Sequence, residues 1–249
     1  MKLVAKLFII LVVLAILGTY SVAKMREARI EARYPPLGQT INVHGKRVQA
    51  YVTGTGPDLV MLHGSSGNMR DMILALEETL APHFRVIIFD RPGLGYSDRL
   101  SKEGDKFIDQ AMILRDAAKK LGANRPIVMG HSMGGIVSMA WATHAPDDLS
   151  GLVLISPVVM PFQTPTSTYY KINKHPLIGP FVNHFIAAFN YNSIVADGIN
   201  EVFAPQPAPA NYREDMAVDL VLRPKTIQSN ARQRNGIHEQ IRALEANYD

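Results

Sequence analysis

The segment whose residue types could most directly do chemistry lies at residues 130–134. It reads Gly-His-Ser-Met-Gly, a G-x-S-x-G pattern with Ser132 at its centre. An apolar run at 126–129 leads into it, and a helix-forming run at 136–143 follows it. A strand–turn–helix of this kind exposes a serine hydroxyl at a tight turn, and the helix N-terminus behind it favours negative charge. The pattern predicts that Ser132 is a nucleophile; the alternative is a glycine-rich turn with a bystander serine.

Two further segments of unusual composition also follow predicted strands. The segment His63-Gly64-Ser65-Ser66-Gly67 comes after the apolar run 59–62, and residues 90–97 read Asp-Arg-Pro-Gly-Leu-Gly-Tyr-Ser after the run 85–89. The remaining predicted strands are 41–43, 48–52, 127–129 and 152–155, and helical patterns begin near Asn68, Phe107, Ser132 and Thr226. This alternation predicts an α/β fold whose parallel sheet is covered by helices on both faces.

Together these motifs resemble the α/β-hydrolase family, in the branch that has a serine nucleophile and a cap. The resemblance implies a mostly parallel sheet with helices on both faces and a hydrolase core at residues 37–157. It implies a helical cap inserted at 158–225, where the sequence is rich in Pro, Asn, Tyr and Phe, and a helix at 226–249 that returns to the core.

The resemblance also implies roles for individual residues. Ser132 would be the nucleophile, and the backbone N–H groups of Met133 and Ser65 would form the oxyanion hole. Asp90 is expected to be a turn residue that pairs locally with Arg91. The residues expected to be structural and close to the site are His63, Gly64, Gly130, His131, Gly134 and Asp90.

A serine at the turn also bears on the substrate. Dehalogenases and epoxide hydrolases that resemble this pattern have an aspartate there, so the serine favours hydrolysis of carboxylic esters through an acyl-enzyme. The same turn would also serve an acyltransferase or a perhydrolase. Aromatic residues of the cap are expected to bind a small apolar ester or acyl group, the alternative being ordinary packing of the cap; they are Tyr169, Tyr170, Phe181 and Phe185. No cofactor and no metal is expected.

The acid and the base of the reaction have no assigned residue. The resemblance implies an acid after the seventh or sixth strand and a histidine after the eighth, but residues 156–161 read Ser-Pro-Val-Val-Met-Pro and the sequence given ends at Asp249. We therefore expect the last two strands to be missing, with a separately encoded C-terminal half as one candidate partner. The histidines that could substitute are His144, His175, His184 and His238. A non-catalytic remnant or binding module is the alternative function.

The N-terminus carries a separate signal. Residues 7–23 contain no charge, which is near the lower limit for crossing the ~30 Å hydrocarbon core of a bilayer as a helix. We predict a membrane anchor at 1–24 and a charged stem at 25–36. The alternative is a signal peptide that is cleaved near Ala23, with export of the rest.

Charge and composition exclude several other classes of protein. Residues 1–33 carry six basic and two acidic side chains, so they account for the whole formal net charge of +4. The rest of the chain has no excess of basic groups, and no nucleic-acid partner is expected. The absence of cysteine excludes disulfide scaffolds, thiolate zinc sites and cysteine nucleophiles.

Overall fold

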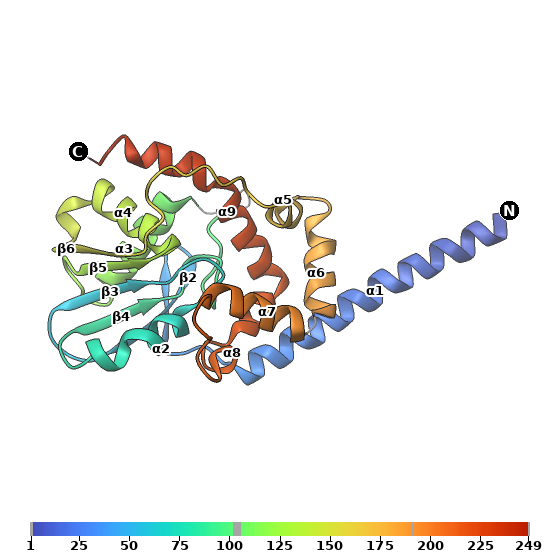
Figure 1. The fold of residues 1–249 in the computed structure, drawn as a ribbon, viewed down its shortest axis with the longest axis horizontal. Coiled ribbons are helices and arrows are strands. Elements are labelled where there is room, and N and C mark those ends of the chain that lie inside the picture. The colour runs from blue at the N-terminus through green and yellow to red at the C-terminus, as the bar shows by residue number, and fades with distance from the viewer. Residues whose placement is uncertain (1, 102–105, 191, 249) are drawn as a thin grey trace.

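A six-stranded sheet forms the centre of the protein in the computed structural model, which describes residues 2–101, 106–190 and 192–248 (Figure 1). The strands are β1 (Gln39–Val43), β2 (Lys46–Thr53), β3 (Asp58–Leu62), β4 (Arg85–Phe89), β5 (Ile127–His131) and β6 (Gly151–Ile155). Their order across the sheet is β1-β2-β4-β3-β5-β6. The β1–β2 and β2–β4 pairs are antiparallel, whereas β4, β3, β5 and β6 run parallel. The predicted α/β architecture is therefore confirmed.

The first helix and those of the core and the cap have the following bounds. They are α1 (Lys2–Arg33), α2 (Met69–Leu80), α3 (Phe107–Lys120), α4 (Met133–His144), α5 (Thr168–Lys174), α6 (Gly179–Phe189), α7 (Asn192–Phe203), α8 (Tyr212–Asp215) and α9 (Pro224–Glu245). Two short 3-10 turns, η1 (Pro146–Asp148) and η2 (Val218–Leu222), complete the set for the described ranges. The predicted cap at 158–225 contains α5 to α8 and η2, together with residue 191, which lies outside the described residues.

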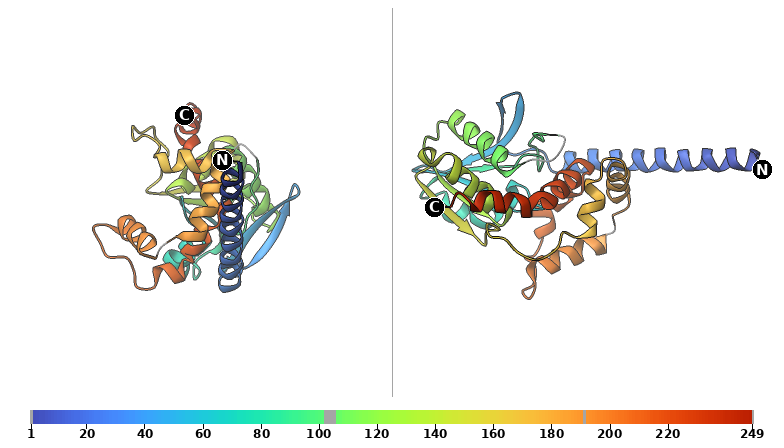
Figure 2. Two further views of the ribbon diagram at one scale, coloured as in Figure 1. Left: turned by 90° about the vertical axis from the view of Figure 1, so that its right-hand side faces the viewer. Right: turned by 90° about the horizontal axis from the view of Figure 1, so that it is seen from above.

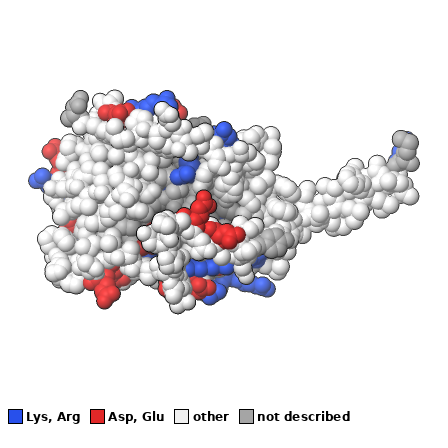
Figure 3. Space-filling model, in the orientation of Figure 1, with Lys and Arg blue, Asp and Glu red and all other residues white. Residues whose placement is uncertain are grey.

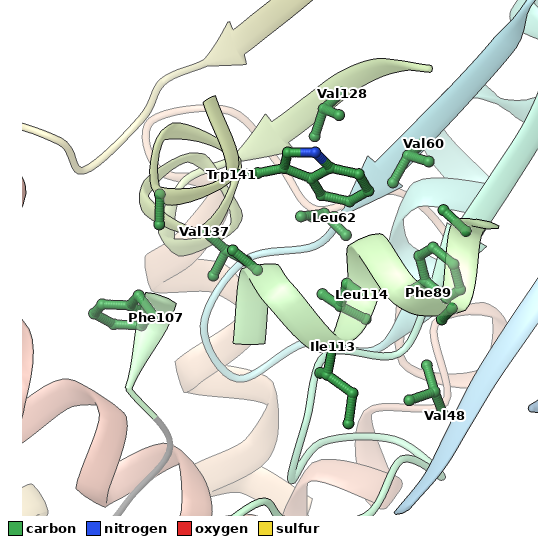
Figure 4. Close-up of a cluster of buried hydrophobic side chains, with 14 of the residues drawn as sticks. Val48, Val60, Leu62, Phe89, Phe107, Ile113, Leu114, Val128, Val137 and Trp141 are labelled. Atoms are coloured by element: carbon green, nitrogen blue, oxygen red, sulfur yellow. The ribbon is translucent and has the colours of Figure 1, made fainter. Parts of the chain in front are cut away.

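Alternate residues of the central strands lie on opposite faces of the sheet and pack in two different hydrophobic clusters, because successive side chains of a strand point to opposite sides. Val60 and Leu62 of β3 pack in a large cluster with helices α3 and α4, where Trp141 and Leu114 are fully buried (Figure 4). Leu59 and Met61 of β3 face a second cluster on the opposite side, beneath α2. Helices on both faces thus hold the carboxyl ends of β3 and β5 at fixed positions, and these are the ends that carry the candidate site.

The N-terminal helix differs from the predicted anchor and stem. Helix α1 continues without a break to Arg33, so most of the stem predicted at 25–36 is helical. The first half of α1 projects away from the body, whereas the second half lies against the cap (Figures 1 and 2). Ala23 is fully buried in a small cluster with Ala187 and Ala188 of α6. A long helix therefore joins the projecting apolar segment rigidly to the cap.

Candidate active site

Ser132 occupies a strained turn between β5 and α4. Its backbone has φ 52° and ψ −117°, a region that residues with a side chain adopt rarely and at a cost of about 1–3 kcal/mol. Three backbone hydrogen bonds hold the turn: Ser132 N donates to Ile155 O of β6, and Val158 N and Gly135 N donate to Ser132 O. The sharp predicted turn is present, and the neighbouring strand determines its conformation.

The glycines on either side of Ser132 are required by close backbone contacts. A Cβ atom at Gly130 would lie 2.4 Å from the carbonyl oxygen of Gly134, and a Cβ at Gly134 would lie 2.2 Å from that of Leu62. Both distances are far below any real contact of a Cβ atom. The absence of a side chain at Gly130 lets α4 approach β5, and its absence at Gly134 lets α4 approach β3. The G-x-S-x-G spacing therefore brings the start of α4 against the end of β3.

The loop after β3 lies directly beside Ser132. A Cβ atom at Gly64 would be 3.2 Å from the Cβ of Ser132 and 3.4 Å from Nδ1 of His131. Within the part of the chain that the structure describes, the backbone N–H groups of Ser65 and Met133 make no hydrogen bond. The two donors that the sequence predicted for an oxyanion hole are therefore both available at the turn or on its neighbouring loop.

A residue that the sequence analysis did not single out holds this loop in place. Asn230 of α9 accepts hydrogen bonds from Ser65 Oγ at 2.9 Å and from Ser66 N at 3.0 Å, and its Nδ2 donates to Ser66 Oγ at 2.8 Å. Asn230 is buried, and its three hydrogen bonds fix the position of Ser65 and Ser66. Asn230 therefore holds the loop that carries the Ser65 N–H.

His63 is built into the scaffold and is not free to act as a base. Its Nδ1 lies 2.9 Å from Gly64 O, and its Nε2 accepts from Arg91 N at 3.0 Å. Burial and the charge of Arg91 hold the pKa of His63 well below its usual value, so the ring is neutral. Both ring nitrogens are thus engaged away from Ser132.

The predicted pairing of Asp90 with Arg91 is wrong. Asp90 Oδ1 accepts from Met69 N at 2.8 Å and Oδ2 accepts from Tyr96 N at 2.8 Å, so this carboxylate joins the start of α2 to the turn at 90–97. Arg91 points elsewhere, since its Nε donates to His63 O at 2.7 Å and its Nη2 donates to Gly64 O at 3.0 Å. Consecutive residues at the end of a strand face opposite ways, which separates the two charged groups. Arg91 braces the loop beside Ser132 in place of the predicted local pair.

The structure does not bring any of the candidate histidines into hydrogen-bonding contact with Ser132 in the described ranges. In the described ranges, no histidine ring is hydrogen-bonded to Ser132 Oγ, and His131 itself lies beside Gly64. The other candidates have partners elsewhere: His144 with Thr143 Oγ1, His175 with the N–H groups of Leu177 and Ile178, His184 with Pro180 O, and His238 with Thr164 O. Nor is any group of three His, Asp or Glu side chains within the described residues arranged to hold a metal ion.

The predicted aromatic residues of the cap lie on α5 and α6. Tyr169 and Tyr170 form an edge-to-face pair with ring centroids 5.2 Å apart, and Arg234 of α9 lies over the Tyr170 ring. Phe181 and Phe185 lie on one stripe of α6 and are 47% and 50% exposed. Their predicted contact with substrate remains a prediction. A hollow of about 960 Å³ lies between α1, β2 and the start of α9, but charged residues line it and Ser132 does not.

Comparison with known proteins gives a consistent pattern. The family profile described as alpha/beta hydrolase fold matches residues 57–177. Haloalkane dehalogenase 2 of Mycobacterium tuberculosis is 28% identical over 196 residues, which are 78% of this chain and 62% of that protein. The pimeloyl-[acyl-carrier protein] methyl ester esterase of Vibrio vulnificus is 36% identical over 108 residues, 41% of this chain and 38% of that one. The chain thus spans about three fifths of the length of the first of these relatives.

Solved structures agree on the fold. A thermophilic esterase from Thermogutta terrifontis superposes with a TM-score of 0.61 at 23% identity, over 82% of this chain and 73% of that one. An alpha/beta hydrolase fold protein from Burkholderia ambifaria superposes with a TM-score of 0.60 at 21% identity, over 85% and 75%. At such identities the similarity concerns the fold alone.

Proposed function

Because the chain belongs to the α/β-hydrolase superfamily, we propose that it is a serine hydrolase that acts on carboxylic esters. The observation that carries the proposal is Ser132 at a positive-φ turn with two unpaired backbone N–H groups nearby. The identity of the residue at the turn favours ester cleavage over dehalogenation, since the resemblance places an aspartate there in dehalogenases. An esterase and a dehalogenase both occur among the similar proteins, and the serine at the turn is what supports the proposal of an esterase.

In the proposed reaction, Ser132 Oγ attacks the carbonyl carbon of the ester. The carbonyl oxygen gains negative charge and accepts hydrogen bonds from the N–H groups of Met133 and Ser65. Such donors typically lower the activation barrier by about 3 kcal/mol each. The alcohol departs to leave an acyl-serine, which water then hydrolyses. The proton of Ser132 must pass to a base. No described histidine is hydrogen-bonded to Ser132, so none of them is assigned as that base. The acceptor of the acyl group would be water in a hydrolase and another nucleophile in an acyltransferase or a perhydrolase.

Helix α1 supports attachment of this hydrolase to a membrane. The helix is long and apolar enough to cross a bilayer, and its large apolar residues from Leu3 to Leu17 are 41–70% exposed. The alternative cleavage site near Ala23 falls in the middle of the helix, where Ala23 is buried against α6. A cut there would remove the part that projects and divide the part that packs, which favours a retained anchor. The mass of the mature protein distinguishes a retained anchor from a signal peptide cleaved near Ala23.

The proposal is tested with a fluorophosphonate probe on the full chain in detergent. We expect the probe to label wild type and to fail on Ser132→Ala. Ser138→Ala is the matched control, because Ser138 is a buried serine of the adjoining helix α4 whose hydroxyl donates to Gly134 O. Circular dichroism would check that all three proteins are folded. Folded wild type that stays unlabelled and turns over no ester would contradict the proposal.

One observation favours a second candidate, a binding module without catalysis. No described histidine is hydrogen-bonded to Ser132, and a serine hydroxyl without a base is a weak nucleophile. In that case esters would bind without turnover, and Ser132→Ala would change neither binding nor product formation. Ester hydrolysis that disappears in Ser132→Ala would exclude this candidate.

A further inference from the structure

Helix α6 of the cap carries an exposed apolar stripe with no obvious use in the core. Phe181, Phe185 and Phe189 recur every four residues, so they share one face of the helix, and they are 43–50% exposed. The turn before α6 extends the stripe with Leu177, which is 83% exposed, and Ile178, which is 55% exposed. Single exposed apolar residues need no explanation, but a contiguous row of five indicates a surface that contacts a partner.

The place of this stripe in the molecule indicates which partner. Helix α6 packs directly on α1: the ring of His184 lies 4.9 Å from that of Tyr20, and Arg26 Nη1 donates to Ala188 O at 2.8 Å. Figures 1 and 2 show α5 and α6 at the end of the body from which the apolar half of α1 projects. Residues 2–19 of α1 lie beyond this contact and would measure about 27 Å at 1.5 Å per residue, close to the thickness of a bilayer core.

The charge pattern agrees with this placement. Helix α6 contains no Lys, Arg, Asp or Glu, and the projecting half of α1 shows almost no charged residue in Figure 3. Lys171 and Lys174 are exposed on the neighbouring α5 and precede Leu177 by six and three residues. An apolar row with basic residues at its edge is typical of surfaces that lie in the headgroup region of a membrane.

We propose that the row Leu177, Ile178, Phe181, Phe185 and Phe189 is a second membrane contact, which inserts into the interface of the same phospholipid bilayer that α1 crosses. This inference rests on the membrane attachment proposed above. It assigns Phe181 and Phe185 to lipid rather than to the substrate pocket. With α1 and α6 both in the membrane, the cap is held at the bilayer surface and an ester dissolved in lipid reaches the enzyme without crossing water.

The natural absence of cysteine makes a direct test simple. Single cysteines are introduced as Leu177→Cys, Ile178→Cys, Leu11→Cys and Leu74→Cys in the full chain and labelled with an environment-sensitive fluorophore. Leu74 is the matched control, because it is an exposed leucine, 46% accessible, on α2, which lies away from α6 and from the projecting half of α1 (Figure 1). The proteins are reconstituted in phosphatidylcholine vesicles with and without a nitroxide-labelled phosphatidylcholine.

We expect the lipid nitroxide to quench the labels at 177 and 178 at least about twofold more than the label at 74. Quenching at 11 with none at 177 and 178 would overturn the cap contact and leave the anchor intact. Quenching at 177 and 178 with none at 11 would retain the cap contact and reject the anchor. The inference would be overturned if lipid does not quench the label at 177 and the label becomes shielded only when the protein-to-lipid ratio rises. The row would then be a contact with a second copy of the chain.

A functional readout separates the same alternatives. Leu177→Asp should lower turnover of an ester carried in the vesicles about tenfold while leaving turnover of a water-soluble ester unchanged, since a buried charge opposes insertion. Leu74→Asp should alter neither rate. Equal loss on both esters, in a variant that circular dichroism shows to be folded, would overturn the membrane contact.

Discussion

At the scale of single residues, the candidate site depends on groups that are buried and hydrogen-bonded rather than exposed and reactive. Asp90 shows this best, because it is almost inaccessible and ties together two segments, the start of α2 and the turn at Tyr96. Burial raises the pKa of Asp90 to about 6. The two backbone N–H donors lower this pKa, as do the charges of Arg223 and Arg70, but together they offset only part of the effect of burial. Its protonation state therefore changes in a range where stability can be measured.

Asp90 is expected to make the fold less stable as pH rises from 4 to 6. Its folded-state pKa of about 6 lies above the ordinary 3.8, so the folded protein binds more protons than the unfolded chain in this window, and up to about 3 kcal/mol is lost on raising the pH through it. His63, whose pKa is lowered, acts in the opposite direction. The measurement is denaturant unfolding of wild type and Asp90→Asn in detergent at several pH values.

The difference between these two proteins isolates Asp90 from His63 and all other titrating groups. The free energy of unfolding of wild type minus that of Asp90→Asn should fall between pH 4 and 6 and stay level above pH 7. The variant itself leaves a backbone donor without an acceptor, which adds a constant loss of about 1–3 kcal/mol. A difference that rises with pH would mean that the backbone donors outweigh burial and that the carboxylate is ionised throughout.

At the scale of elements, strand and helix patterns predicted the scaffold but not the contacts between distant segments. The six strands and the turn at Ser132 follow from apolar runs and from glycine spacing, both of which are local. Asn230 lies 165 residues from Ser65, and nothing in its neighbourhood distinguishes it from other polar residues of a helix. Only the folded chain brings the two together, and the same holds for the contact of Ala23 with Ala187.

The opposite directions of Asp90 and Arg91 escaped prediction for a related reason. Adjacent opposite charges suggest a pair, but the strand before them sends one side chain toward α2 and the other toward the loop after β3. The sequence shows that both residues are present, but it does not show in which direction each side chain points. Motifs therefore predict which residues gather at the site, whereas the bonds that hold them depend on packing between elements.

The close approach of α4 to β3 predicts a large difference between two helical glycines. Gly134→Ala places a methyl group 2.2 Å from Leu62 O and 2.8 Å from His63 O, both backbone atoms that cannot move aside. We expect a loss of about 3 kcal/mol in the free energy of unfolding and loss of probe labelling at Ser132. Chemical denaturation measures the first and gel fluorescence the second.

Gly198→Ala on α7 is the matched control. It is also a glycine inside a helix, but nothing lies within 4 Å of the added carbon. We expect it to raise the stability by about 0.5–1 kcal/mol, because alanine restricts the unfolded chain and favours the helix. Equal effects of the two substitutions would show that helix propensity, and not contact with β3, determines the role of Gly134.

At the scale of the whole molecule, the two edges of the sheet differ in character. The β1 edge reads Gln-Thr-Ile-Asn-Val and alternates polar with apolar residues, as an edge exposed to water should. The β6 edge reads Gly-Leu-Val-Leu-Ile, and β6 pairs with β5 on one side and with no other strand in the described ranges. Val153 in its middle is 38% exposed. An apolar strand with an unpaired side is a template for pairing with another chain.

This asymmetry predicts self-association through β6 in the full chain in detergent. Val153→Lys should raise the concentration at which dimers form by about tenfold, the effect of 1.4 kcal/mol, because a charge at the edge opposes strand pairing. Thr40→Lys on β1 is the control and should leave the association unchanged, since that edge is already polar. Sedimentation velocity over a range of concentrations measures both. If the two substitutions act alike, the chains associate through another surface, and the exposed apolar row on α6 is the next one to test.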